Sequence, residues 1–152
     1  MLKELLRKVA KEDAKYGGRL QPPAKPKELG RMRQDALERL GYEIPEDYVD
    51  FLEIADGLDY DGIVLFGSSS KPMVDKPDLE IEGFMDANER MRKDMESADQ
   101  YIFFGTDNDE VLAFGFERQE FLILDEVSFD PLENYYSYAV LVAAVLKKRF
   151  AK

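Results

Sequence analysis

The spacing of apolar residues predicts three helices in the first part of the chain. In residues 2–14 and 27–40, and in a third segment that begins at Pro45, apolar side chains recur three or four positions apart, so each segment has one apolar face. Pro45 is expected at the first helical position, where its missing N–H costs nothing. The three apolar faces consist of Leu2, Leu5, Leu6 and Val9; of Leu29, Met32, Ala36, Leu37 and Leu40; and of Tyr48, Phe51, Leu52 and Ala55.

Runs of aromatic and β-branched residues predict strands in the second part of the chain. A short strand is expected within residues 62–67, an extended piece within 78–83 and a helix over 87–96. The strongest pattern is in residues 101–125, where three apolar runs are separated by loops so short that the strands must pair as an antiparallel meander. A last helix is expected from about Asn134 to Phe150.

These elements predict a single α+β domain, an antiparallel sheet with a central meander and helices packed on one of its faces. Residues 1–26, a helix followed by a proline-rich loop, are expected to form an extension packed on a domain of residues 27–152.

The composition excludes several kinds of chemistry. The chain has no Cys and no His, which excludes disulfides, thiolate metal sites and histidine-based catalysis. We therefore expect no metal, no cofactor and no catalytic residues. The first residues lack a secretory apolar run and no stretch is long enough to span a membrane, so the expected compartment is the cytoplasm.

The charge is distributed unevenly along the chain. The net charge of −11 combines +5 in residues 1–40, −20 in residues 41–136 and +4 in residues 137–152. An acidic surface of this kind repels nucleic acid and anionic membranes and attracts basic proteins. The other interpretation of the acids is that they only keep the protein soluble.

Four segments resemble chemical sites and are interpreted as structural. Residues 57–62 have two acids of a calcium loop, but the first and twelfth ligand positions are Gly57 and Ser68. Residues 62–69 have the glycine spacing of a phosphate loop without its lysine, and residues 107–110 are acidic but typical of a tight turn. The aromatic residues of 101–121 have acidic flanks, which favours core packing over the stacking of bases.

Residues 37–57 read LExxGxxIPEDYxxFLxxxDG, and residues 101–107 read YIxFGTD, followed by the later predicted strands and the terminal helix. With these motifs in this order, residues 28–150 resemble the SUKH superfamily. The family includes fungal regulators of cell-wall synthesis and bacterial immunity proteins that neutralise toxins, many of them nucleases. It has no shared catalytic residues, so the resemblance implies a binding protein rather than an enzyme.

The sequence thus favours an immunity protein that docks acidic loops onto a basic toxin domain. A regulatory scaffold for endogenous partners and, less favoured, a carboxylate-based hydrolase remain as alternatives. The partner-binding residues expected from the sequence are Asp59, Tyr60, Asp61, Asp107, Asp109, Glu110, Glu126, Asp130, Glu133, Tyr135 and Tyr136. The tyrosines are included because a few aromatic side chains often contribute most of the binding energy.

Overall fold

The fold is built on a six-stranded antiparallel sheet, and a computed structural model describes it over residues 2–150. The α-helices are α1 (Leu2–Ala14), α2 (Pro26–Asp35), α3 (Glu46–Leu52), α4 (Phe84–Asp94) and α5 (Tyr138–Phe150), with a π-helical turn η1 (Ala36–Leu40) and a 3-10 turn η2 (Ala98–Gln100). The strands are β1 (Leu58–Tyr60), β2 (Ile63–Leu65), β3 (Lys71–Pro72), β4 (Glu80–Ile81), β5 (Tyr101–Asp107), β6 (Glu110–Gly115), β7 (Glu120–Asp125) and β8 (Pro131–Tyr135).

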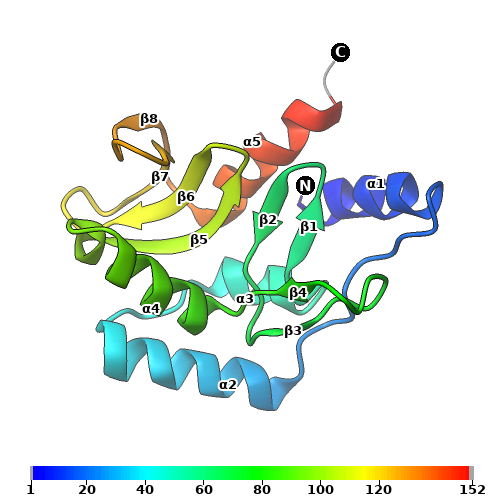
Figure 1. Cartoon of the computed structure of the whole chain (residues 1–152), viewed down its shortest axis with the longest axis horizontal. Helices are drawn as coiled ribbons and strands as arrows, with labels where there is room; N and C mark the ends of the chain where they lie inside the picture. The colour runs from blue at the N-terminus through cyan, green and yellow to red at the C-terminus, as the bar shows by residue number, and fades with distance from the viewer. Residues whose placement is uncertain (1, 151–152) are drawn as a thin grey trace.

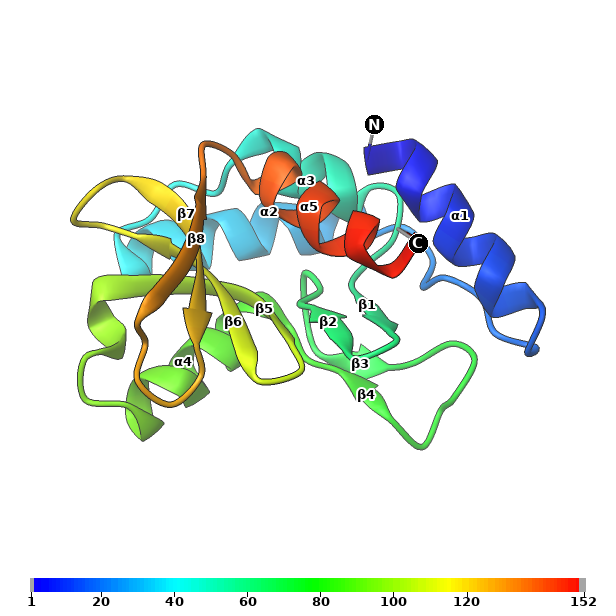
Figure 2. The ribbon, with the colours of Figure 1, turned by 90° about the horizontal axis from the view of Figure 1, so that it is seen from above.

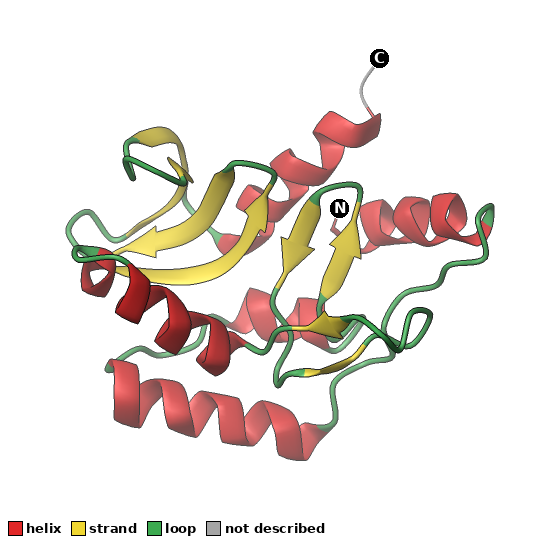
Figure 3. Ribbon diagram, viewed as in Figure 1, coloured by secondary structure: helices red, strands yellow, loops and turns green. Residues whose placement is uncertain are grey.

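The strand order of the main sheet is β1-β2-β5-β6-β7-β8, and every neighbouring pair is antiparallel. The predicted meander of residues 101–125 is confirmed as β5, β6 and β7, and β3 and β4 form a separate two-stranded sheet. The α+β class is confirmed as well (Figure 3).

Helices cover both faces of the sheet, so the expectation of helices on one face is wrong. Figure 2 shows α2, α3 and α5 on one side of the strands and α4 on the other. Ile102 and Phe104 of β5 belong to the main core with α3 and α5, whereas Phe103 packs with Met91 of α4 in a second core. Because successive residues of a strand point to opposite faces, a continuous apolar run needs cover on both sides.

The predicted helix of residues 2–14 is confirmed as α1, and it is part of the main core. Leu5, Leu6 and Val9 are buried there, and α1 packs against α5 (Figure 1). The proline-rich segment is bound to the end of α3, because the N–H of Ala24 donates to the Leu52 carbonyl at 2.8 Å. The apolar face of α1 is therefore occupied within the molecule.

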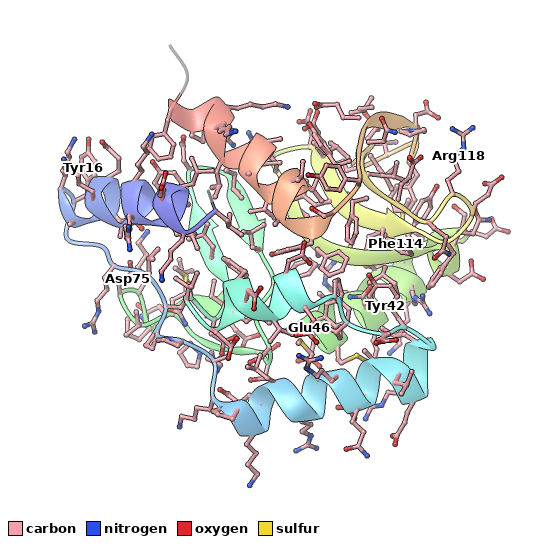
Figure 4. All side chains as sticks on the ribbon, turned by 180° about the vertical axis from the view of Figure 1, so that it is seen from behind. Tyr16, Tyr42, Glu46, Asp75, Phe114 and Arg118 are labelled. Carbon is pink, nitrogen blue, oxygen red and sulfur yellow. The ribbon has the colours of Figure 1, made fainter. Side chains whose placement is uncertain are left out.

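The second predicted helix changes its geometry before it ends. From Ala36 the chain forms the π-helical turn η1, and Gly41 closes it in the left-handed conformation with a φ of 62°. A π turn has more residues per turn than an α-helix, so it rotates the apolar face. Leu37 is accordingly 61% exposed, which corrects its predicted burial, whereas Tyr42 packs on Phe114 with ring centroids 5.4 Å apart (Figure 4).

Two further element boundaries differ from the sequence prediction. Pro45 is the cap that precedes α3 rather than its first residue. The last helix begins at Tyr138 instead of Asn134, because residues 131–135 form the edge strand β8. Pro131 is the first residue of β8, a position at which an edge strand tolerates proline.

No helix in the described residues combines the length and apolarity needed to cross a membrane.

Candidate protein-binding surface

Three hairpin turns meet at one end of the main sheet. They connect β1 to β2, β5 to β6 and β7 to β8 (Figure 1). The N–H of Asn108 in the second turn donates to the carbonyl of Gly62 in the first at 3.0 Å. The N–H of Glu126 in the third turn donates to the carbonyl of Asp109 in the second at 3.1 Å. These backbone bonds join the three turns into one continuous surface.

The first two turns follow from residues that tolerate a positive φ. Asp61 and Gly62 have φ values of 49° and 85°, the pattern of a two-residue hairpin turn that matches the twist of its strands. Asn108 occupies the second turn with a φ of 54°. A side chain on Gly62 would collide with that of Asn108, so the close approach of the two turns also requires glycine there.

The third turn is shaped by a carboxylate and anchored by an aromatic ring. The Oδ1 of Asp125 accepts the N–H groups of Val127 and Ser128 at 2.9 and 3.0 Å, and these hydrogen bonds lower the pKa of Asp125. Phe129 has a positive φ of 59°, and its buried ring packs on Tyr101 at 5.6 Å. The buried ring offsets the strain of that backbone conformation.

The turns and their flanks are strongly acidic. Residues 59–61, 107–110 and 125–133 contain nine acidic side chains and no basic one. We call the solvent-accessible members of this group the acidic turn surface, namely Asp59, Asp61, Asp109, Glu110, Glu126, Asp130 and Glu133. The structure thus places seven of the predicted partner-binding residues on one end of the sheet.

The last turn of α5 provides the nearest cations. The Nη2 of Arg149 lies 2.5 Å from the Oδ1 of Asp107, and its Nε lies 3.3 Å from the Oδ2 of Asp61. Lys148 pairs with Glu133 at 2.9 Å. The side chain of Asp107 is only 8% exposed, so it is not the exposed loop acid that the sequence predicted.

Repulsion among the acids remains despite these two cations. Burial, followed by the charges of Asp107, Glu133 and Asp109, raises the pKa of Glu110, although Lys148 partly opposes the rise. The neighbouring carboxylates therefore lie close enough to Glu110 to disfavour its charge, in addition to the larger effect of burial. A cationic partner would relieve that repulsion.

The predicted tyrosine anchors do not lie together at the turns. Tyr60 is half-buried, and its ring stacks on Phe150 with centroids 6.3 Å apart. Tyr135 pairs with Phe121 near the opposite end of the sheet and donates its hydroxyl to Glu133 at 2.6 Å. Tyr136 follows it and is 84% exposed, so it is available to a partner but distant from the turns.

A buried ionic cluster elsewhere was not predicted from the sequence. Asp56, 1% exposed, accepts the backbone N–H of Ser68 at 2.7 Å and pairs with the Nζ of Lys71 at 2.5 Å. Lys71 also pairs with Glu28 of α2 at 2.6 Å. The cluster adjoins a cavity of about 460 Å³, to whose lining Glu28, Ser68 and Ser69 contribute. Residues so far apart in sequence carry no local signal of their pairing.

The ionic cluster does not have the properties of an acid–base pair. The hydrogen bond from Lys71 lowers the pKa of Glu28, the opposite of what a general acid at neutral pH requires. Burial alone would lower the pKa of Lys71, but hydrogen bonds to Asp56 and Glu28 outweigh it and the pKa is raised. Both groups therefore stay ionised at neutral pH and hold each other in place.

The other sequence motifs have structural roles. Residues 57–62 form the β1–β2 hairpin, and residues 2–150 contain no group of three or more acidic side chains arranged to hold a metal ion. Residues 62–67 form strand β2 and its flanks, and Phe114 and Phe121 are buried in the main core, as their acidic flanks indicated.

The chain matches no protein-family model, and a search of curated proteins gives no significant match.

Proposed function

We propose that the chain is a binding protein whose acidic turn surface docks onto a basic surface of another protein. The proposal rests mainly on three acidic turns that backbone hydrogen bonds join into one surface. The segments of these turns contain nine acidic side chains and no basic one. Only Lys148 and Arg149 pair with those acids among the described residues.

The arrangement supports both fast encounter and stable docking. An excess of one charge on one end of a molecule steers a partner of opposite charge and raises the association rate. The backbone bonds between the turns fix their relative positions before binding, so little conformational entropy is lost when the partner arrives. Relief of the repulsion at Glu110 adds a favourable contribution.

The partner that we propose is a basic toxin domain, neutralised in the cytoplasm. The resemblance of residues 28–150 to the SUKH superfamily supports this, since that group contains many immunity proteins. A nuclease needs a positive cleft for its phosphate backbone, and an acidic turn surface is complementary to such a cleft. The proposal requires no catalytic residue, metal or cofactor in this chain.

Affinity capture from the native host tests the proposal when it is combined with charge reversal. The bait is the full chain, and a second bait carries Asp109→Lys and Glu126→Lys, two exposed positions on adjoining turns. We expect a basic protein to be captured by the first bait and lost with the second. A matched control bait carries Glu96→Lys and Asp99→Lys, exposed acids away from the turns. Equal loss with both variants, or capture of the same protein by all three baits, would contradict the proposal.

A further inference from the structure

The edge strand β8 and the groove beside it form a second surface with features of a docking site. β8 is the last strand of the main sheet, and among residues 2–150 only β7 pairs with it. In Figure 1 it stands at the upper left of the sheet, whereas the opposite edge, β1, lies beside α5 and α1 (Figure 2). One edge of β8 therefore presents unpaired backbone groups.

The devices that usually protect an edge strand are confined to one end of β8. Pro131 stands at its first residue, and the pairing with β7 shifts register between Ile123 and Leu124, both next to the turn. Leu132 is the residue without a partner in that shift, and from Glu133 to Tyr135 the strand continues in regular register without proline. That stretch is long enough to pair with a short extended segment.

Exposed apolar side chains occur along β8 and its flanks. Six large apolar side chains in the described residues are well exposed, and three of them belong to this segment: Val127 at 80%, Leu132 at 50% and Tyr136 at 84%. Val127 is in the turn before β8 and Tyr136 follows its other end, whereas Leu132 contributes to the groove beside the strand.

A groove runs along the sheet beside the edge. It has a volume of about 430 Å³, and Gly115 and Leu122 of the sheet, Tyr101 and Leu132 contribute its apolar lining. A Cβ atom at position 115 would lie 2.9 Å from the Cδ1 of Leu122, so the glycine leaves room beside that side chain. Specificity in strand addition comes from such recesses, which receive alternate side chains of the added strand.

The charge around the groove selects a basic occupant. Residues 117–136 contain six acidic side chains and one basic one, Arg118, at the tip of the β6–β7 turn (Figure 4). Arg118 contributes to the lining of the groove together with Glu117, Glu120 and Glu133, so the lining has three acids and one base. A second copy of this chain would bring like charges together, so pairing of β8 with itself is disfavoured.

We propose that β8 binds an extended, basic segment of the protein partner by strand addition. The segment pairs with the free edge of residues 133–135, places an apolar side chain in the groove, and directs lysine or arginine side chains to the glutamates of its rim. This inference rests on the proposed function in that the partner is a basic protein, but it uses a different surface from the acidic turns.

Nuclear magnetic resonance with a model peptide tests the inference. The probe is a short blocked peptide in which lysine alternates with valine, added to the isotope-labelled full chain. We expect amide shifts and slower hydrogen exchange in residues 133–135, and a binding constant at least about tenfold weaker in Leu132→Lys, where a cation would occupy the groove. The matched control is Leu79→Lys, which changes an equally exposed leucine (52% against 50%) outside the groove.

The outcomes separate this inference from the proposed function. Shifts confined to Asp61, Asp109 and Glu126 would overturn strand addition and leave the acidic turn surface in place. Shifts in β8, together with partner binding that survives charge reversal at the turns, would overturn the acidic turn surface and leave strand addition in place. Absence of any shift, an undiminished affinity in Leu132→Lys, or concentration-dependent dimerisation through β8 would each overturn the inference. Glu117→Lys repeats the test at an exposed position where misfolding is not expected.

Discussion

Arg149 and Asp107 form an ion pair that joins the end of α5 to the β5–β6 turn, with Nη2 and Oδ1 2.5 Å apart and side-chain exposures of 16% and 8%. The same guanidinium donates from Nε to the carbonyl of Asp61 at 3.1 Å. One arginine therefore holds two of the three turns of the acidic turn surface, and its role combines stability with the positioning of the exposed acids.

Asp107→Asn is expected to reduce the free energy of unfolding by on the order of 1.5–3 kcal/mol, because it leaves the half-buried Arg149 without its closest charge partner. Urea denaturation followed by circular dichroism measures the change. Asp109→Asn, an exposed neighbour on the same turn, is the control and should stay within about 0.5 kcal/mol of the unsubstituted protein. Equal effects at the two positions would show that the ion pair contributes nothing specific.

The sequence predicted the parts of the fold that depend on local pattern. The β5–β7 meander and α1 were correctly predicted because their apolar residues repeat at a strand or helix period over many positions. β8 was missed because its burial alternates only weakly and Pro131 suggests a break. Leu37 was misplaced because a π turn leaves no trace in a periodicity analysis that assumes an α-helix.

The acids of the candidate surface were predicted, but their individual environments were not. The sequence placed acidic residues in three loops, and the structure brings those loops together. The sequence alone does not distinguish Asp107, which is buried, from Asp109, which is exposed. The partner of Asp107 is Arg149, which is 42 residues away in the chain. The pairing of Asp56 with Lys71 escaped prediction for the same reason, since long-range ion pairs have no local sequence signature.

Glu110→Gln is expected to stabilise the folded protein at neutral pH and to weaken partner binding. Burial and repulsion from Asp107 raise the pKa of Glu110 in the folded state, so its charge is unfavourable at any pH above the unfolded value of about 4.3. The gain should be on the order of a few tenths of a kcal/mol at pH 7 and vanish near pH 3, where the carboxyl is protonated in both states. Thermal unfolding at the two pH values measures it. A gain that is equal at both pH values would exclude charge repulsion as its source.

Glu28→Gln is expected to have the opposite pH dependence. The hydrogen bond from Lys71 lowers the pKa of Glu28, so its contribution to stability is complete above about pH 5 and is lost as the pH falls through the folded pKa. The variant should therefore lose about 1 kcal/mol at pH 7 and much less at pH 3. Denaturant titrations at both pH values test this. Glu38→Gln, an exposed position on η1, serves as the control and should show little difference at either pH.

Tyr48 and Tyr138 allow a matched test of buried hydroxyl groups. Their rings lie 4.8 Å apart in the core, but the hydroxyl of Tyr48 donates to the Phe66 carbonyl at 2.8 Å, whereas that of Tyr138 has no hydrogen-bond partner among the described residues. Tyr48→Phe should cost about 1–3 kcal/mol, because it also leaves the carbonyl unpaired. Tyr138→Phe should be neutral or stabilising, since it removes an unsatisfied polar group. Equal costs in urea denaturation would contradict this distinction.

The acidic turn surface should reveal itself in the salt dependence of association with the captured partner. Charges act over about 8 Å at physiological ionic strength, so added salt should slow association while changing dissociation much less. Asp109→Lys combined with Glu126→Lys should lower the association rate and flatten its salt dependence, because the reversal weakens the electrostatic attraction of a basic partner. Both side chains are exposed and contribute little to stability, so the fold should be unaffected. Stopped-flow kinetics at several salt concentrations measures both rates. Exposed acids on α4 provide the control, and Glu89→Lys with Asp94→Lys should leave the rate much less affected. If association proved insensitive to salt and to all of these reversals, the acidic turn surface would serve only solubility.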